Sequence, residues 1–556
     1  MDCEIKHVYC GANRIISSLG ADTKANYRAI EAYKTNINEK QYSTPLCRID
    51  RGELDFEALD GYSFAEQISI MALSDVIVQT GVSLKSPRTL LIISTTKGNI
   101  ECLNDDFKRS YLWTMAGNIS GYFECLNTPQ IVSNACISGT SAIIIGSRLI
   151  EDGTYDNVYV LGVDVISEFI VSGFNSFKSI SPTVCRPYDA SRDGLTLGEA
   201  CGVLFLTNDR NLSDSKVIIA GGGISDDSNH ISGPSRTGEG LFNAIDASMK
   251  QAGVVSEEIG FVNAHGTATS FNDEMESKAL DMASLTAVPC NSLKPYLGHT
   301  LGASGVIETI LAVEQLCHNH IFGVKGYSSN GVPFELNVTS DHRDMQTDHC
   351  LKTVSGFGGT NAAIVLSKEA VCKQRRLVTK VVNIVDVAHI EIVRQENTEF
   401  AAYIREEYRK LGESNMKFFK MDNLSKLGYV ASCKLLKGIE LNCPSNRMAI
   451  VMANRSSSMD TDINHQAITD RHLPEGASPS VFVYTLANIV AAEIAIKHKF
   501  KGELSFFVMK EKSLNGFIAE YSEKLIRRDI CDVVMYGWCE LSGDEYNAEL
   551  KLIKGE

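Results

Sequence analysis

The sequence lacks the features of several protein classes. No stretch approaches the roughly eighteen unbroken apolar residues of a membrane-spanning helix, so we expect no membrane span. The opening stretch MDCEIKHVYCGANR carries acidic residues and no apolar signal-peptide core, and the 16 cysteines include no CxxC pair. Scattered cysteines of this kind are typical of reduced thiols. We therefore expect a cytoplasmic protein without a disulfide framework.

An excess of basic charge is also absent. The net charge of −15 argues against nucleic acid as the main partner, because phosphate contacts need clustered Lys and Arg. The acidic excess is confined to one part of the chain: residues 1–370 carry 43 acidic and 27 basic side chains, whereas residues 371–556 carry 25 and 26. This shift predicts a domain boundary near residue 370.

What the chain has is length and an alternation of strand and helix patterns. Its 556 residues, 44% apolar and 22% charged, correspond to about three to four domains of a globular protein. Apolar, β-branched runs predict strands at TLLIIST (89–95), PQIVSN (129–134) and NVYVLGVD (157–164), with a helix over TSAIIIGSRLIEDG (140–153). This order favours parallel strands in a layered α/β fold. There is no low-complexity tract and no short tandem repeat.

Four loops carry residues capable of chemistry. NACISGTS (134–141) places Cys136 at the start of a helix, whose dipole favours a thiolate, although a lone cysteine is also compatible with an inert buried thiol. NAHGTATSFNDEMESKAL (263–280) presents His265 at the end of a strand. NSLKPYLGHTLGASG (291–305) carries Lys294 and His299. SGFGGTNAAIV (355–365) is rich in glycine, which lets backbone N–H groups approach a ligand closely.

These loops, in this order and together with VCRPYDASRDGLTLGEACGVLFL (184–206), resemble the β-ketoacyl-acyl carrier protein synthases, the condensing enzymes of fatty acid and polyketide synthesis. The resemblance covers about residues 3–368. Its Cys–His–His set is similar to that of the chain-elongating synthases, since the initiating ones have Cys–His–Asn. It implies a thiolase-like α/β fold of five layers and two similar halves, residues 1–210 and 211–368, followed by a linker at 369–380.

The chemistry of condensation agrees with the roles that the resemblance implies. Cys136 can hold one acyl chain as a thioester. After decarboxylation of a malonyl thioester, neutral His265 and His299 can donate N–H groups to the enolate oxygen. Lys294 would disfavour charged imidazoles, and we expect Glu276 to balance its charge.

The resemblance also implies substrate contacts. The backbone N–H groups of Cys136 and Phe357 would form the oxyanion hole, with Phe357 acting in addition as a gate. Thr267 and Thr269 would bind the pantetheine arm. The implied partner is an acyl carrier protein bearing 4′-phosphopantetheine, with no further cofactor, and the implied assembly is a homodimer. Because carrier proteins of this system are acidic, we expect a local basic patch to dock them.

Some alternatives stay open. CHNH (317–320) and the cluster His342, His349 and Cys350 lack the usual spacing of zinc ligands, so no metal is expected. The protein could be a non-extending acyltransferase or hydrolase on the same fold. It could also be a non-catalytic partner subunit that controls chain length, although the retained Cys–His–His set argues against this. The sequence leaves the acyl chain length and the pathway open.

Residues 381–556 have no counterpart in standard elongating synthases, yet they are similar to the N-terminal half. RMAIVMANRSSSMDTD (447–462) is similar to RTLLIISTTKGNIECL (88–103). SPSVFVYTLANIVAAEIAIKHKFKGE (478–503) resembles the helix before the nucleophile, and EKLIRRDICDVVMYGWCEL (523–541) is similar to SRLIEDGTYDNVYVLGVDVI (147–166). We therefore predict a truncated, catalytically inert synthase half in which the place of Cys136 falls near Glu511 or Lys512. The alternative is an unrelated α/β appendage.

Overall fold

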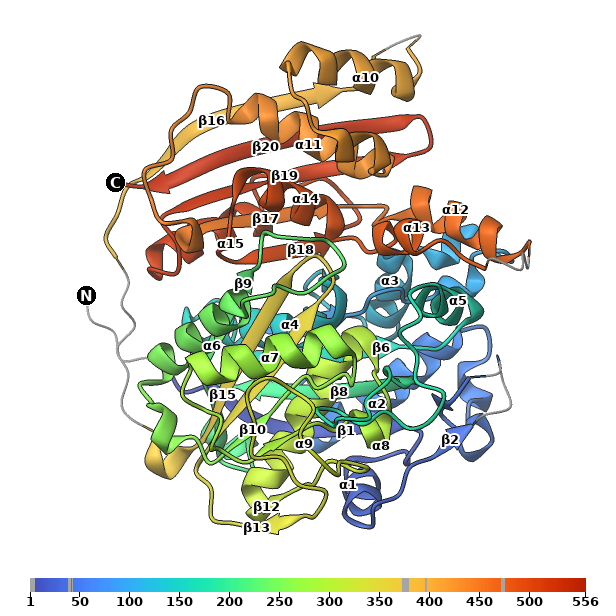
Figure 1. Cartoon of the computed structure of the whole chain (residues 1–556), viewed down its shortest axis with the longest axis vertical. Coiled ribbons are helices and arrows are strands. Elements are labelled where there is room, and N and C mark those ends of the chain that lie inside the picture. Colours follow the sequence, from blue (N-terminus) through green and yellow to red (C-terminus); the bar gives the residue numbers. More distant parts are fainter. Residues whose placement is uncertain (1–5, 39–41, 43, 373–379, 396–397, 472–475) are drawn as a thin grey trace.

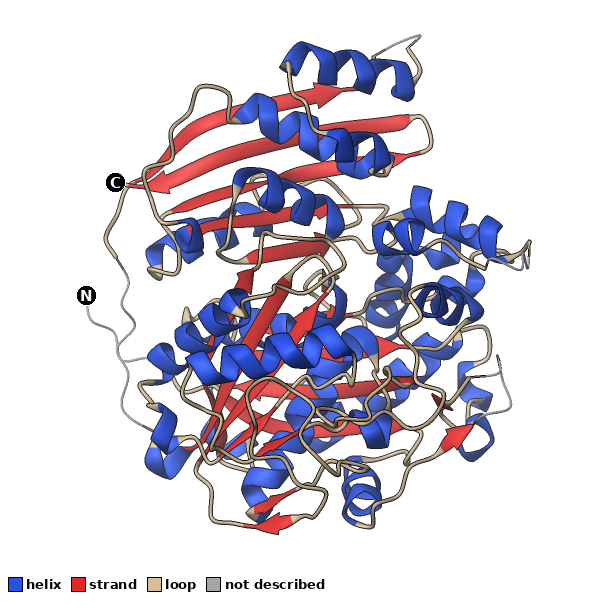
Figure 2. Ribbon diagram, in the orientation of Figure 1, coloured by secondary structure: helices blue, strands red, loops and turns tan. Residues whose placement is uncertain are grey.

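The computed structural model describes residues 6–38, 42, 44–372, 380–395, 398–471 and 476–556 (Figure 1). Most of the expected linker lies outside these residues. Within the described chain, fifteen strands are hydrogen-bonded in the order β11-β10-β14-β15-β9-β1-β8-β6-β4-β5-β18-β17-β19-β20-β16. Figure 2 shows the helices packed between and around these strands, with the C-terminal segment stacked on the rest. The predicted thiolase-like layered fold with an additional half is confirmed.

The N-terminal half builds the strands around the nucleophile. Its main elements are β1 (Tyr9–Ser17), α2 (Phe64–Thr80), β4 (Thr89–Ser94), α3 (Leu112–Tyr122), β5 (Gln130–Val132), α4 (Ser138–Glu151), β6 (Asn157–Asp164) and β8 (Ala200–Thr207). β5, β4 and β6 are parallel, as the sequence predicted. Every residue of α4 is buried, so this helix lies in the central layer.

The second half has the same alternation of strands and helices as the first, and it carries the loops with His265 and His299. Its main elements are β9 (Val217–Asp226), α6 (Glu239–Ala252), β10 (Phe261–Asn263), α7 (Ser270–Met282), β11 (Cys290–Asn291), α9 (Ser304–His318), β14 (His349–Gly356) and β15 (Thr360–Lys368). Helices α4 and α9 touch through glycine: a Cβ on Gly139 would lie 2.7 Å from the Val306 nitrogen, and one on Gly305 would lie 2.2 Å from the Thr140 nitrogen. This close approach brings the loops before both helices together.

The C-terminal segment, residues 380–556, has the topology of an N-terminal half. Its elements are β16 (Ile384–Val393), α10 (Phe400–Leu411), α11 (Asn423–Leu435), β17 (Met448–Asn454), α12 (Met459–Thr469), α13 (Pro479–Tyr484), α14 (Ile489–His498), β18 (Leu504–Val508), α15 (Phe517–Arg527), β19 (Val533–Ser542) and β20 (Glu545–Gly555). The order β18-β17-β19-β20-β16 repeats β5-β4-β6-β8-β1 with the same strand directions. The predicted truncated half is confirmed, and the alternative of an unrelated appendage is wrong.

The strand register also locates the position that corresponds to Cys136. In the alignment of 88–103 with 447–462, Ser94 corresponds to Ala453. Ser94 pairs with Val132 in the first half, and Ala453 pairs with Phe507 in the tail. Since Cys136 lies four residues after Val132, its counterpart is Glu511. The next residue, Lys512, forms ion pairs through its Nζ with Glu549 at 2.5 Å and Glu391 at 3.8 Å. An exposed charged residue beside a surface ion-pair network therefore stands where the other half has its thiol.

The tail joins the synthase halves at the nucleophile loop. Strands β5 and β18 pair antiparallel, with Val132 opposite Phe507. The Ser133 N–H donates to the Phe506 carbonyl at 3.1 Å, and the Asn134 Nδ2 donates to the Leu504 carbonyl at 2.7 Å. One apolar cluster continues from the N-terminal half into the tail. The β5 edge is thus occupied within a single chain.

None of the helices in the described part of the chain has the length and apolar character needed to span a bilayer.

This junction predicts the effect of removing the tail. A chain ending at residue 372 would leave β5 as an open strand edge beside an uncovered part of the shared apolar cluster. We expect it to dimerise or aggregate, whereas the full chain has this edge covered. Size-exclusion chromatography with light scattering on both proteins measures the difference. A shortened chain that stays a soluble monomer would contradict a structural role for the tail.

Candidate active site

Cys136 lies on a tight turn between β5 and α4. Ala135 has φ of 49°, a left-handed conformation that is strained for a residue with a Cβ. The turn is held by Ser138, whose Oγ accepts from the Asn134 N–H at 2.7 Å and donates to the Ala135 carbonyl at 2.6 Å. The adjacent Gly356 is close, since a Cβ there would lie 3.1 Å from the Cys136 nitrogen. The turn therefore directs the thiol away from the sheet and toward the glycine-rich hairpin.

The two predicted histidines converge on this thiol. The Cys136 Sγ is 3.1 Å from His299 Nε2, and His299 Nδ1 is 3.1 Å from the Ser304 Oγ. Because a hydroxyl can donate or accept, both neutral tautomers of His299 have a partner. The His265 ring lies edge-on to His299, with centroids 5.3 Å apart. His265 Nδ1 is buried and has no hydrogen-bond partner among the described residues.

Both imidazoles are neutral at physiological pH. Burial, together with the charge of Lys294, lowers the pKa of His299 to about 3. Burial and Lys294 likewise hold the pKa of His265 well below its usual value. The expectation of neutral histidines is confirmed, and such rings can act as N–H donors.

The predicted partner of Lys294 is wrong. The Lys294 Nζ pairs with Glu308 at 2.8 Å, and Glu308 also pairs with the Nζ of Lys352 at 2.6 Å. All three side chains are buried, so one carboxylate holds two ammonium groups beneath the histidines. Sequence reasoning missed Glu308 and Lys352; the available signal was an acidic residue between apolar residues of one helix and a lysine within an apolar strand.

Glu276 instead supports the loop that carries His265. Its carboxylate accepts from the backbone N–H groups of His265 and Gly266, both at 2.8 Å, and from the Tyr188 hydroxyl at 2.6 Å. The physical reason is its place on α7, which starts directly after this loop and directs the side chain back under it. Thr353 Oγ1 donates a further hydrogen bond at 2.8 Å.

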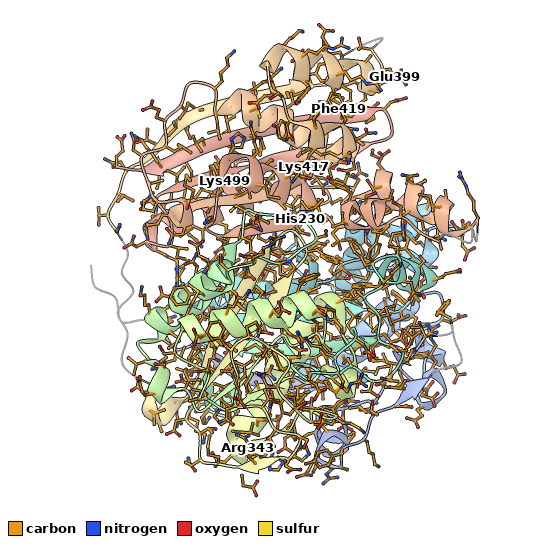
Figure 3. All side chains as sticks on the ribbon, in the orientation of Figure 1. His230, Arg343, Glu399, Lys417, Phe419 and Lys499 are labelled. Atoms are coloured by element: carbon orange, nitrogen blue, oxygen red, sulfur yellow. The ribbon has the colours of Figure 1, made fainter. Side chains whose placement is uncertain are left out.

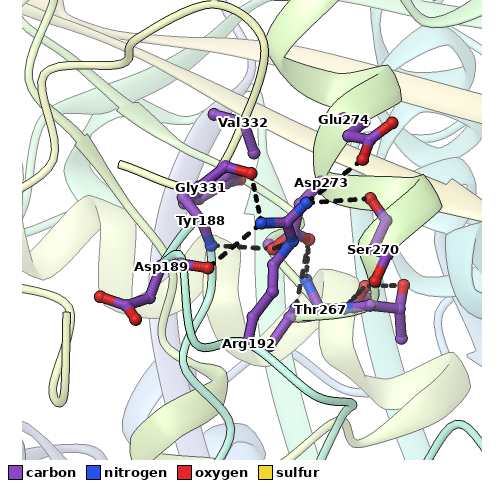
Figure 4. A network of polar contacts seen from close by, with 12 residues as sticks. Tyr188, Asp189, Arg192, Thr267, Ser270, Asp273, Glu274, Gly331 and Val332 are labelled. Carbon is purple, nitrogen blue, oxygen red and sulfur yellow. Dashed lines mark hydrogen bonds and ion pairs between the residues drawn. The ribbon is translucent and has the colours of Figure 1, made fainter. Parts of the chain in front are cut away.

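The same loop has a second support around Asp273, shown in Figure 4. The Asp273 carboxylate accepts from the Thr267 N–H at 3.0 Å and from the Tyr188 N–H at 2.8 Å. Arg192 lies beside it, with Nε 4.0 Å from Asp273, and donates to the Asp189 carbonyl at 3.1 Å. Residues of the stretch at 184–206 thus belong to this hydrogen-bond network, and the network holds the backbone of the loop that carries His265 and Thr267.

A cavity of about 310 Å³ leads from the surface to this site. It is lined by the thiol, both histidines and Phe357, and it reaches the surface at Phe271, which is 77% exposed. Thr267 and Thr269 also line it, with their hydroxyls 2.9 Å apart, and their binding of a pantetheine arm stays a prediction. No group of His, Cys, Asp and Glu able to hold a metal ion occurs among the described residues.

The tail reaches Phe357, for which the resemblance implies a gating role. The Asn488 Nδ2 donates to the Phe357 carbonyl at 2.9 Å, and a Cβ on Gly358 would lie 2.6 Å from that nitrogen. The Phe357 ring packs against Phe177 with centroids 5.5 Å apart. Asn488 was not identified from the sequence, because only the folded tail brings it to the hairpin.

The charge state of the thiol differs from the sequence-based expectation. Burial raises the pKa of Cys136 to about 12, against the lowering effect of Lys294 and of the backbone N–H groups of Phe357 and Cys136. The resting group is therefore a neutral thiol. The helix dipole does not prevail, because the cost of burying an unpaired anion exceeds its favourable effect.

The fold and the Cys–His–His site define a thiolase-like condensing-enzyme architecture. Residues 61–211 match the family model described as "Beta-ketoacyl synthase, N-terminal domain", and residues 217–326 match "Beta-ketoacyl synthase, C-terminal domain". Residues 61–326 of this chain belong to the β-ketoacyl synthase family.

Individual relatives agree with this family. The "3-oxoacyl-[acyl-carrier-protein] synthase 2" of Vibrio cholerae is 31% identical over 272 residues, 46% of this chain and 66% of that protein. The "Putative polyketide beta-ketoacyl synthase 1" of Streptomyces cyaneus is 32% identical over 273 residues, 46% of this chain and 64% of that protein. The chain thus spans about two thirds of the length of the curated relatives it matches.

Solved structures share the fold. A ketosynthase from Xenorhabdus doucetiae, in complex with its chain length factor, is 24% identical and has a TM-score of 0.57 over 65% of this chain and 98% of its own. The structure titled "PfaC Keto synthase-Chain length factor" is 14% identical and has a TM-score of 0.78 over 99% of this chain and 78% of its own. The second likeness includes the tail.

The buried thiol predicts slow alkylation by iodoacetamide. With its pKa raised, Cys136 has little thiolate at pH 7, and we expect it to react at least about a hundredfold more slowly than free cysteine. The rate should rise about tenfold per pH unit from pH 7 to pH 10, because the thiolate fraction does so. Peptide mass spectrometry at Cys136 follows the reaction, with Cys136→Ala as the background control. A rate that levels off below pH 9 would show a stabilised thiolate instead.

Proposed function

We propose that the chain is a 3-oxoacyl-[acyl-carrier-protein] synthase that catalyses decarboxylative condensation of an acyl thioester with a malonyl thioester. The observation that carries this proposal is the 3.1 Å contact between the Cys136 Sγ and His299 Nε2, with neutral His265 in the same cavity. The product would serve fatty acid or polyketide-type synthesis.

The first half-reaction is transfer of the acyl group to Cys136. As the substrate carbonyl approaches, His299 Nε2 can take the thiol proton while the sulfur attacks, and the pantetheine sulfur leaves and is protonated. The backbone N–H groups of Cys136 and Phe357 favour the anionic oxygen of the tetrahedral intermediate. A thiol that stays neutral until substrate binds would also resist unwanted oxidation or alkylation.

The second half-reaction uses the histidines as hydrogen-bond donors. When the malonyl carboxylate leaves as carbon dioxide, its electron pair forms an enolate, and His265 and His299 can donate to the enolate oxygen. The enolate carbon then attacks the acyl carbonyl on Cys136, a C–C bond forms, and the cysteine sulfur leaves. Lys294 and Lys352 would assist by keeping both rings neutral, so that each ring has one N–H and no net charge.

Substitutions at the site test this assignment. Cys136→Ala should abolish condensation, whereas Cys136→Gln, whose amide can occupy the space of the acyl group, should still release carbon dioxide from malonyl-carrier protein. His265→Ala and His299→Ala should each slow decarboxylation by at least about a hundredfold while leaving acyl transfer to Cys136 measurable. Mass spectrometry detects the 3-oxoacyl product. Free acid in its place would instead indicate the alternative function of a non-extending acyltransferase or hydrolase.

The acyl carrier protein would dock where the tail borders the cavity mouth. The loop 228–238 contributes Ser232, Gly233 and Pro234 to the cavity lining. The tail meets this loop: the Lys499 Nζ donates to the Ser228 carbonyl at 3.3 Å, and burial together with the nearby charge of Lys417 lowers the pKa of His230. Figure 3 shows His230, Lys417 and Lys499 near one another at the boundary of the two parts.

We call residues Met416–Lys420 the basic patch. This segment precedes α11 and combines Lys417 and Lys420 with exposed Met416 and Phe419. Apolar side chains flanked by lysines suit an acidic amphipathic helix. The segment before α2, which is the counterpart of α11, instead carries Asp55, Glu57 and Asp60. The two halves therefore differ in charge at equivalent places, and the basic one serves the half with the thiol.

Reversal of charge tests this docking surface. The double variant Lys417→Glu with Lys420→Glu should raise the KM for malonyl-carrier protein about tenfold and reduce its dependence on salt. Lys437→Glu, at the opposite end of α11, is the matched control and should change neither. Turnover of a small malonyl thioester should be the same in all three proteins. A KM for the carrier protein unaffected by the double variant would place the docking surface elsewhere.

A further inference from the structure

A second, much smaller cavity lies on the tail side of the thiol. It is lined by Cys136, Ile170, Phe174, Phe357, Phe482 and Leu486 among others, and its volume is about 20 Å³. A space of roughly 10–15 Å³ on this measure holds one water molecule. Since the pantetheine arm would occupy the larger cavity, this small one is the space left for the acyl chain. It has room for about one methyl group.

The far wall of this small cavity belongs to the tail. Phe482, on α13, is 2% exposed, and its ring lies 5.4 Å from Phe174 and 5.2 Å from His465 between centroids. The ring rests directly on Gly173: a Cβ at that position would lie 2.1 Å from the Phe482 Cδ2. The absence of a side chain at Gly173 thus leaves space for the Phe482 ring. Because this ring forms the tail side of the small cavity and is packed on several sides, we call Phe482 the plug.

A buried ion pair holds the plug in place. The Lys97 Nζ pairs with Asp462 on α12 at 2.6 Å, and it donates to the Ser458 hydroxyl at 3.2 Å and to the Thr485 carbonyl. All three acceptors come from the tail, although Lys97 belongs to the synthase. Both charged side chains are 4% exposed.

The ion pair connects the plug to the active-site loops on both sides. In the tail, the Thr485 Oγ1 donates to the Phe482 carbonyl at 2.6 Å, so the residue that accepts from Lys97 also holds the plug. In the synthase, Asp164 accepts from the Lys97 N–H at 3.2 Å and from the Gly302 N–H at 2.7 Å, three residues after His299. Removing one partner of a buried pair leaves an uncompensated charge, so this contact strongly favours one placement of α13.

We propose that Phe482, positioned by the Lys97–Asp462 pair, ends the acyl pocket close to Cys136 and makes the enzyme favour the shortest acyl groups. This inference rests on the proposed function, because it concerns the acyl group held by Cys136. The step affected is transthiolation: the acyl–sulfur bond to the donor breaks, a bond to the Cys136 sulfur forms, and the thiol proton ends on the departing donor thiol.

The test measures loading of Cys136 in the full chain. Acetyl, butyryl, hexanoyl and octanoyl thioesters of N-acetylcysteamine, which mimic the pantetheine end, are each incubated with the protein, and intact-protein mass spectrometry follows the acyl adduct. Acetyl and butyryl should load at least about tenfold faster than octanoyl. Phe482→Ala should raise the octanoyl-to-acetyl ratio at least about tenfold, and Phe482→Leu, which preserves more of the packing, should raise it to a smaller extent.

Lys97 is tested as a positioning residue. Lys97→Met should raise the octanoyl-to-acetyl ratio because the plug loses its anchor, whereas a loss of stability alone would lower both rates together. The double variant Lys97→Met with Asp462→Leu replaces the pair by apolar groups and should return the ratio toward that of the parent protein.

Two results would overturn the inference. One is octanoyl loading as fast as acetyl loading in the parent protein, and the other is a ratio unchanged in both Phe482 variants. Absence of an adduct with every thioester would be a different failure. It would contradict the proposed function itself, and the pocket inference would fall with it.

Discussion

The structure depends on the pairing of β5 with β18. This pairing continues into the hydrogen bond from Asn134 to the Leu504 carbonyl, two residues before the thiol. The loop that presents Cys136 is therefore completed by a strand about 370 residues away in the sequence. The same junction places α13 beside the small cavity next to Cys136, and it places Asn488 beside the Phe357 carbonyl. A single chain thus fixes geometry that two separate subunits could reach only by binding each other.

Burial and charge together set the chemistry of the site. Glu308 compensates Lys294 and Lys352, so the cationic groups beneath the histidines are tolerated in the interior. Their remaining field still lowers the pKa of both imidazoles, in addition to burial. A charged ring would bind an enolate strongly but would also give up its proton to it. Under the proposed function, neutral rings would stabilise the enolate through N–H groups alone, and burial together with the two lysines favours this neutral state.

The local sequence was enough to predict which loops hold the candidate catalytic residues, and it predicted much of the order of strands and helices. Cys136, His265 and His299 each lie in a loop next to a strongly patterned element, so their meeting followed from the fold. The tail was predictable because its strand and helix patterns repeat those of the first half. The partner of Lys294 could not be predicted. Glu308 and Glu276 are both acidic residues on helices near Lys294, and only the folded structure shows which of the two side chains faces the lysine. The neutral state of Cys136 likewise depends on burial, which one loop does not reveal.

The two similar halves have diverged in a way that assigns them different tasks. Glu511, next to Lys512 with its ion pairs to Glu549 and Glu391, stands at the place of Cys136, so the tail has no thiol at this position. Its segment before α11 is basic, whereas the matching segment before α2 is acidic. A carrier protein attracted to the tail would face the cavity that leads to the one thiol able to accept its acyl group. Under the proposed function the two halves are complementary, because one supplies the thiol and the other supplies the basic docking surface.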